Sequence, residues 1–323
     1  MNTDAHAHII PAELMKSEFL SPEVEQIGPG VYSYVIWGSR IRPAYAALND
    51  ERIHLSYMEE QNIQKEYLSV PPYLFGYDKD SGFGREWSRA YNESLAALCR
   101  RHPARFGGLG TVPMQDVPSA VAELSYCVNT LGFAGVELCS HVNQEDLDEE
   151  RFADFFEAAN KLGCAILIHP HNIPAPRRLS KYYMANLVGN PTETALTAAR
   201  MLLSGFFDRY PGLRVCFSHG GGAFPFVYGR IKNGFSVRDE PKAGGLKTLE
   251  LPRNMFFDTI VYDRSPFRFM LETVGAERVL LGTDYPFDMR MREPVVKIQG
   301  WCEPIEAKLV TQENPMRFFR MGE

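Results

Sequence analysis

The sequence lacks any long apolar run. Its apolar segments, such as Ala165–Ile168 and Val279–Leu281, extend for only a few residues, whereas a membrane-spanning helix needs about 20. The N-terminal residues contain neither the basic start nor the apolar stretch of a signal peptide. We therefore expect a cytoplasmic protein with no membrane partner.

Paired cysteines and excess positive charge are also lacking. None of the six cysteines belongs to a Cys-x-x-Cys pair, and most lie in apolar segments, which indicates reduced core residues. The 34 Lys and Arg residues are outnumbered by 40 Asp and Glu, for a net charge of −6. Such a chain has no overall positive field to attract nucleic acid or anionic lipid, so we expect a small-molecule partner.

What the chain does contain is a regular alternation of short apolar and amphipathic segments, typical of parallel strands joined by helices. Eight alternations predict an α/β protein with a (β/α)8 TIM barrel rather than an open doubly wound sheet. We expect one domain over residues 1–323, with an insertion at about 11–63 covering the barrel mouth. The predicted strands are Thr3–Ile9, Glu66–Val70, Phe106–Val112, Gly135–Cys139, Ala165–His169, Arg214–His219, Met255–Thr259 and Val279–Asp284.

One of the connecting helices is predicted over Asp146–Leu162. The acidic residues 145–150 would form its first turn, where negative charge suits the helix dipole. Gly163 would end the helix in a left-handed conformation. The acidic run is then most simply a solvated helix start.

Polar side chains recur at the ends of the predicted strands. His6 and His8 lie two apart on the first strand, so both side chains point to the same side. His169, His219 and Asp284 end strands five, six and eight, and barrel enzymes assemble their active sites at this end. The alternative interpretation of the histidine pair, taken alone, is that these are two polar residues at a strand end that bind no metal.

A buried cluster of four imidazoles and a carboxylate is costly unless a cation or hydrogen bonds satisfy it. Three imidazoles and one carboxylate, with no thiolate, suit Zn²⁺ best and leave Mn²⁺, Fe²⁺ or Co²⁺ as alternatives. The fifth group is then available for proton transfer. Strand four offers no Lys that could bridge two ions as a carbamate, so we expect one metal, although Glu137 on that strand weakens this inference.

Several motifs occur together and in order. They are the His-x-His strand, His169-Pro170, the run from Ser218 to Pro225 and the run from Gly282 to Phe287. The chain resembles the amidohydrolase superfamily over nearly its whole length, and within it the aminocarboxymuconate-semialdehyde decarboxylase-like family. Relatives on this scaffold include aromatic-acid decarboxylases and a few hydrolases.

This resemblance implies roles for the five strand-end residues. His6, His8, His169 and Asp284 would be the metal ligands, and His219 would be the catalytic acid/base beside the metal-bound water. An imidazole titrates near neutral pH and can therefore carry the proton. The alternatives for His219 are a fifth ligand or a core histidine satisfied by hydrogen bonds.

The resemblance also implies arginine anchors for a substrate carboxylate, which the planar guanidinium binds at two points. Arg230 would reach into the neighbouring subunit's site across a homodimer interface. The second anchor would come from the insertion, where Arg40 and Arg42 compete and Arg42 is preferred. His171 and Asn186 stand where the family has aromatic residues, so we expect them to contact the substrate in a more polar pocket.

These observations predict a metal-dependent, non-oxidative decarboxylase, a C–C lyase without an organic cofactor, with metal-bound water and His219 in proton transfer. Its substrate would be a carboxylated muconate semialdehyde or a hydroxylated or amino-substituted aromatic acid. The alternative is a metal-dependent hydrolase of an amide, lactone or ring-cleavage product on the same site. A barrel that only binds or scaffolds is less favoured, because every ligand position is retained.

Overall fold

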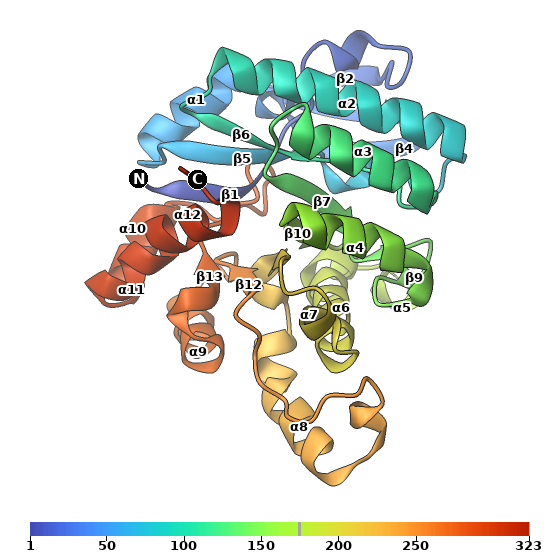
Figure 1. Ribbon diagram of the computed structural model, residues 1–323. Coiled ribbons are helices and arrows are strands. Elements are labelled where there is room, and N and C mark those ends of the chain that lie inside the picture. The colour runs from blue at the N-terminus through green and yellow to red at the C-terminus, as the bar shows by residue number, and fades with distance from the viewer. Residues whose placement is uncertain (174–175, 323) are drawn as a thin grey trace.

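The centre of the molecule is an eight-stranded parallel sheet (Figure 1). The structure is a computed structural model, and it describes residues 1–173 and 176–322. The strands follow one another around the sheet in chain order, with helices outside, so the predicted (β/α)8 barrel is confirmed. They are β1 (Thr3–His8), β5 (Lys65–Ser69), β6 (Phe106–Gly110), β7 (Gly135–Cys139), β10 (Ala165–His169), β11 (Arg214–Phe217), β12 (Met255–Asp258) and β13 (Val279–Leu280).

The first and last strands meet to close the barrel. The Ala5 amide donates to the Leu281 carbonyl at 2.8 Å, and the His8 amide donates to the Tyr285 carbonyl at 2.7 Å. Strands of a closed barrel are buried on both faces, which explains why strands such as β7, β10 and β11 are rich in apolar residues and are buried throughout.

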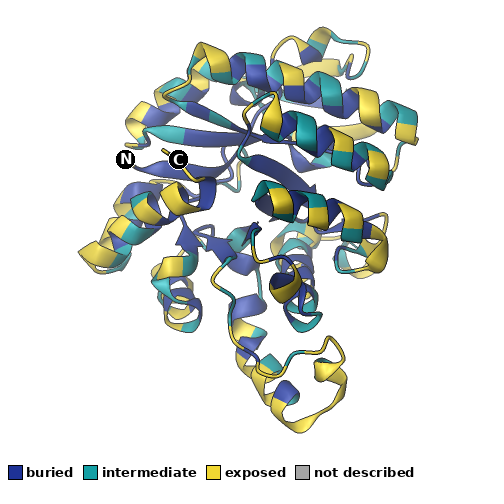
Figure 2. Cartoon of the chain, viewed as in Figure 1, coloured by how far each residue is buried: buried dark blue, intermediate teal, exposed yellow. Residues whose placement is uncertain are grey.

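Helices surround the strands, with their exposed faces outward (Figure 2). The helix α2 is an example. Asp80 caps its N-terminus by accepting a hydrogen bond from the Phe83 amide at 3.0 Å. Trp87, Tyr91 and Leu95 then recur every fourth residue and are fully buried. The helices are α1 (Glu51–Glu60), α2 (Ser81–Arg101), α3 (Val117–Asn129), α4 (Ala153–Leu162), α5 (Pro176–Leu179), α6 (Asn190–Leu203), α7 (Phe206–Arg209), α8 (Phe224–Val237), α9 (Arg264–Val274), α10 (Pro294–Trp301), α11 (Pro304–Lys308) and α12 (Asn314–Phe319).

The start of the helix predicted over Asp146–Leu162 is wrong, although its end at Gly163 is confirmed by a left-handed φ of 62°. The acidic run instead contains β9 (Glu145–Asp146), which pairs with β8 (His141–Val142). Arg200 on α6 binds Asp148 at 2.8 Å, and also contacts Asp146 and Glu149. These acidic side chains serve a tertiary ion-pair network, which outweighs their suitability for a helix start.

Residues 11–63 contain a small antiparallel sheet followed by α1. The sheet consists of β2 (Glu23–Gly28), β3 (Val31–Ile36) and β4 (Ser39–Tyr45). Residues 41–43 of β4 line a cavity at the carboxyl ends of the barrel strands, so this segment contributes to the surroundings of the candidate site. No helix in the described part of the chain is long and apolar enough to cross a membrane.

Candidate metal centre

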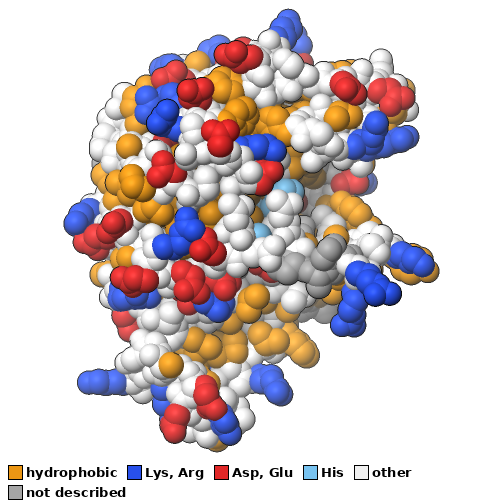
Figure 3. All heavy atoms as spheres, turned by 90° about the vertical axis from the view of Figure 1, so that its right-hand side faces the viewer, with side chains coloured by type: hydrophobic (Ala, Val, Ile, Leu, Met, Phe, Trp, Pro, Cys, Tyr) orange, Lys and Arg blue, Asp and Glu red, His pale blue; other side chains and the backbone are white. Residues whose placement is uncertain are grey.

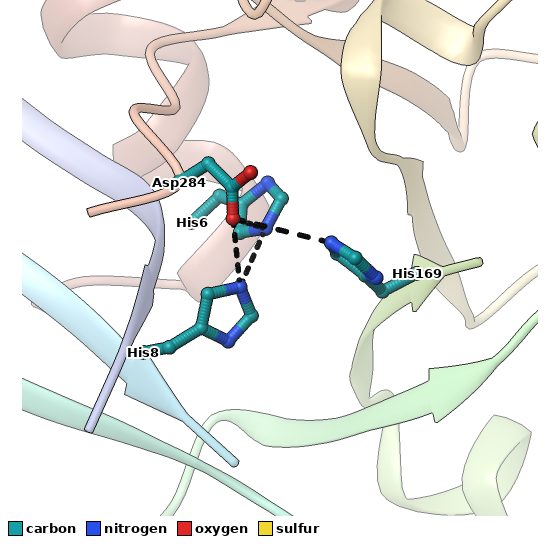
Figure 4. Close-up of side chains that lie close together, drawn as sticks. All are labelled: His6, His8, His169 and Asp284. Atoms are coloured by element: carbon teal, nitrogen blue, oxygen red, sulfur yellow. Dashed lines mark hydrogen bonds and ion pairs between the residues drawn. The ribbon is translucent and has the colours of Figure 1, made fainter. Parts of the chain in front are cut away.

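Four side chains from three strand ends meet at the carboxyl end of the barrel (Figure 4). His6 and His8 come from β1, His169 is the last residue of β10, and Asp284 follows β13. One potential ligand atom from each residue lies within 4.8 Å of those of the other three, and all four residues are buried. The structure therefore brings together the four residues that the family resemblance implied as metal ligands.

The short distances within this group involve the Nε2 atoms of the imidazoles. His6 Nε2 lies 3.0 Å from His8 Nε2. Asp284 Oδ1 lies 3.1 Å from His8 Nε2, 3.5 Å from His6 Nε2 and 4.0 Å from His169 Nε2. One carboxylate oxygen and three imidazole nitrogens thus face a common point.

The opposite nitrogens of the rings face fixed acceptors. His6 Nδ1 lies 2.7 Å from Asp258 Oδ2, and His8 Nδ1 lies 3.1 Å from the Val70 carbonyl. His169 Nδ1 lies 2.9 Å from the Pro170 carbonyl. With Nδ1 protonated, each ring presents an unprotonated Nε2 to the common point, which is the arrangement that metal-binding histidines use.

Asp258 is a residue that the sequence reasoning missed. It is fully buried at the end of β12 and also accepts the Gly220 amide at 2.7 Å. Its position as the one carboxylate in the predicted strand Met255–Thr259 could have drawn attention to it. Only the fold, however, brings it against a histidine 252 residues away.

The pKa shifts agree with the protonation states that metal ligands need. Burial lowers the pKa of His8 and, together with the charge of His219, holds that of His169 well below its ordinary value. For Asp284, burial opposes ionisation, but the neighbouring imidazoles of His219, His8 and His6 outweigh it and hold the pKa well below its usual range. The group thus offers two neutral imidazoles and an ionised carboxylate in addition to His6, and a divalent cation requires deprotonated ligands.

Two atoms of this group have no hydrogen-bond partner in the described part of the chain. They are His169 Nε2 and Asp284 Oδ1, and both are buried. Buried polar atoms without partners are destabilising and rare in native proteins. A divalent cation at the common point would satisfy both, so the residues present fit a metal ion.

His219 lies beside this group rather than within it. Its Nε2 is 3.6 Å from Asp284 Oδ2, the carboxylate oxygen that does not face the other imidazoles, and it has a left-handed φ of 55°. Burial alone would lower the pKa of His219, but the hydrogen bond and charge of Asp284 and the charge of Asp258 raise it above its ordinary value. His219 is thereby suited to hold a proton near neutral pH.

Glu137 lies on the far side of His8. Its Oε1 is 3.9 Å from His8 Nδ1, the nitrogen that points away from the common point. The side chain is fully buried, and burial raises its pKa well above the usual range. Glu137 therefore does not face the common point of His6, His8, His169 and Asp284.

Two adjoining cavities open onto His219 and Asp284. One, of about 210 Å³, is also lined by Arg42, His171 and Asn186. The other, of about 360 Å³, shares Asn186 and extends along apolar side chains that include Leu187, Pro191 and Val261. Figure 3 shows histidine side chains in a hollow on this face. A larger cavity, of about 630 Å³, lies at the opposite end of the barrel and contains none of these residues.

The arginines predicted to bind substrate lie in different surroundings. Arg42 lines the smaller cavity, whereas Arg40 points to Ser33, with Nη1 3.1 Å from its hydroxyl oxygen. Arg230 is exposed on α8 and is not among the residues that line either cavity. Burial, together with the charge of His141, lowers the pKa of His171 to about 4, so its imidazole is neutral at pH 7.

Comparison with known proteins adds the following similarities. A model of the amidohydrolase family matches residues 3–321. The 2-amino-3-carboxymuconate-6-semialdehyde decarboxylase of Dictyostelium discoideum is 35% identical, over 82% of this chain and 74% of that protein. The crystal structure of 5-carboxyvanillate decarboxylase from Sphingomonas paucimobilis superimposes with a TM-score of 0.81 at 27% identity, covering 99% of this chain and 98% of that one.

A further solved structure shares the fold. It is a dihydroxybenzoic acid decarboxylase from Polaromonas sp., determined with bound manganese and the inhibitor 2-nitroresorcinol. Its TM-score is 0.79 at 23% identity, and the match covers 100% of this chain and 98% of that one.

Proposed function

Because the chain belongs to the amidohydrolase family, we propose that it is a metal-dependent, non-oxidative decarboxylase. Its substrate is a carboxylated muconate semialdehyde or a hydroxylated or amino-substituted aromatic acid. The observation that carries the proposal is the buried group of His6, His8, His169 and Asp284, with unpartnered ligand atoms. Similarity to decarboxylases of such acids supports the reaction class.

The four grouped residues hold one divalent cation. When bound, the cation supplies an electrophile that polarises a substrate oxygen and lowers the pKa of water. Three imidazoles and a carboxylate suit Zn²⁺, and Mn²⁺ is the first alternative because a structural neighbour contains it. The ligand types alone do not select between these ions, since availability also decides occupancy.

His219 performs the proton transfer. In the decarboxylation, the C–C bond to the carboxylate breaks, CO₂ leaves, and the electron pair stays on the substrate carbon. Protonated His219 delivers a proton to that carbon and becomes neutral. Its raised pKa and its position beside Asp284 support this role, because a general acid needs a pKa near the working pH.

The smaller cavity binds the substrate. Arg42 pairs with a carboxylate or another anionic oxygen through its guanidinium, and Asn186 and neutral His171 offer hydrogen bonds to further polar groups. The location of all three residues in the lining supports this assignment. A carboxylic acid with additional oxygen or nitrogen substituents matches the hydrogen-bonding groups of Arg42, Asn186 and His171.

Arg230 acts across a homodimer interface. It is exposed on α8, a helix that projects from the barrel (Figure 1). The same helix carries Phe226, which is 80% exposed and contacts the half-exposed Phe269 on α9 at a ring distance of 6.3 Å. Apolar side chains exposed side by side are typical of a surface that another subunit covers.

A screen of metal-loaded protein tests the function. The protein is reconstituted with Zn²⁺ or Mn²⁺ and incubated with hydroxylated and amino-substituted aromatic acids and with carboxylated muconate semialdehydes. We expect CO₂ release and the ultraviolet spectrum of the decarboxylated product, with no added organic cofactor. Stoichiometric metal without CO₂ release from any of these acids, combined with hydrolysis of a lactone or amide, would reject the decarboxylase in favour of a hydrolase.

A further inference from the structure

Another buried carboxylate, Asp4, lies where the last strand meets the first. It is fully buried and is outside the group of potential ligands. Its Oδ1 accepts the backbone amides of His6 at 3.0 Å and of Thr283 at 3.1 Å. Its Oδ2 accepts the Thr283 hydroxyl at 2.5 Å. One carboxylate thus holds the backbone of His6 and that of the residue preceding Asp284.

The Thr283 hydroxyl continues this connection to the other side of Asp284. Its oxygen accepts the backbone amide of Tyr285 at 3.2 Å, so a chain of hydrogen bonds runs from Asp4 through Thr283 to Tyr285. Asp284 therefore lies between Thr283 and Tyr285, the two residues that this series of hydrogen bonds connects. Its own amide donates to the His6 carbonyl at 2.9 Å.

The backbone at Asp284 needs such support. Its φ is 62°, a left-handed conformation that is unfavourable for residues other than glycine and persists only where the surroundings enforce it. The last strand, β13, ends at Leu280, before Asp284 is reached. Beyond it, isolated backbone bonds such as that from the Asp284 amide to the His6 carbonyl still connect this segment to β1, and the side-chain bonds of Asp4 and Thr283 reinforce them.

Asp4 also lies at an irregularity of the first strand. The pairing of β1 with β5 changes register between Asp4 and Ala7. A bulge re-aims the side chains that follow it, and His6 lies within this interval. The hydrogen bond from the His6 amide to Asp4 spans the same interval, so the carboxylate supports the local geometry of both residues it connects.

We propose that Asp4 and Thr283 are positioning residues. Their hydrogen bonds form a clamp between the first strand and the segment that follows the last strand, and this clamp sets the distance between His6 and Asp284 for metal binding. This inference rests on the proposed metal site. Neither residue touches the ion or the substrate. The clamp acts through the backbone of the two ligands, and residues that orient ligands in this way change metal affinity by about 10- to 100-fold when they are replaced.

The test compares two variants of Thr283. Thr283→Ser keeps the hydroxyl, whereas Thr283→Val keeps the shape and removes it. Metal affinity is measured by competition of the apoprotein with a chromogenic chelator for Zn²⁺, a readout independent of turnover. We expect the Val variant to bind Zn²⁺ about 10- to 100-fold more weakly than wild type, and the Ser variant to bind close to wild type.

Thr311→Val is the matched control. Thr311 is also buried and donates its hydroxyl to the Ala307 carbonyl at 2.8 Å, within its own helical segment. It should lose comparable thermal stability without losing metal affinity. Equal affinity of the Thr283→Val and Thr311→Val variants would overturn the clamp while leaving the metal site intact. Wild-type protein that binds no Zn²⁺ or Mn²⁺ would overturn the proposed function and the clamp with it.

Asp4→Ala provides a second variant. It removes both carboxyl oxygens, so the contacts with the backbone amides of His6 and Thr283 and with the Thr283 hydroxyl are all lost. We expect weaker Zn²⁺ binding than in wild type. Wild-type affinity in this variant would also contradict the clamp.

Discussion

The two ends of the barrel are built from different chemistry. At the amino ends of the strands, Phe318 of α12 packs edge-on against Phe256 at 5.2 Å, and Phe319 stacks on Tyr67 at 3.4 Å. All four rings are buried. At the carboxyl ends, the buried side chains are instead imidazoles and carboxylates, some with unpartnered atoms.

The difference shows how the molecule separates stability from chemistry. Aromatic packing at one end stabilises the barrel through buried apolar area. At the other end, left-handed backbone at His219 and Asp284 and uncompensated polar atoms both oppose folding. Such features persist at functional sites when the rest of the structure supports them, and barrel enzymes carry their chemistry at this end.

The largest expected effect comes from removing a ligand at the carboxyl end. His6→Ala should lose stoichiometric Zn²⁺ and all detectable decarboxylation. The variant keeps only one of the two β1 imidazoles, and the three remaining donors no longer enclose an ion. Metal content after dialysis, read by elemental analysis, is the measurement. A variant that retained one ion per chain would show that the grouped residues are not the binding site.

Next in size is the loss of His219. His219→Ala should keep the metal but lower kcat by about 10²- to 10⁴-fold, the usual contribution of a positioned general acid or base. Comparing metal content with turnover separates this variant from His6→Ala. Loss of the metal together with activity would instead make His219 a ligand.

The opposite end should respond in the opposite way. Phe318→Ala removes a fully buried ring and should lower the free energy of unfolding by about 3–5 kcal/mol. Metal affinity and kcat below the melting temperature should stay near wild type. Denaturant unfolding and a Zn²⁺ titration of the same sample provide the measurement. Equal losses in both would mean that the two ends are not separable.

The smallest effect tests the cavity beside the metal group. Arg42→Ala should raise KM for a carboxylate substrate by about ten- to a hundredfold, since a hydrogen bond to a charged group contributes about 1.5–3 kcal/mol. Arg40→Ala is the matched control, because Arg40 points to Ser33 and Glu25 instead of the cavity. Similar KM values in the two variants would exclude Arg42 as an anchor.

Strand positions and potential ligands were accessible from the sequence because both depend on short patterns. Buried parallel strands are continuous apolar runs, and polar residues at their ends stand out against these runs. The start of α4 was not accessible, because Arg200 draws the preceding acidic residues into ion pairs that no local pattern reveals. The preference for Arg42 over Arg40 depended on resemblance, since both are cations on the same short segment.

The sequence by itself determined the eight-fold alternation of strands and helices and the identity of the side chains that end the strands. Only the tertiary structure decided which buried carboxylates support the candidate site. Asp258 reaches His6 and Asp4 reaches Thr283 across separations of 252 and 279 residues. These contacts arise because closing the barrel brings the last strands against the first, and side-chain hydrogen bonds depend on positions that no local periodicity records.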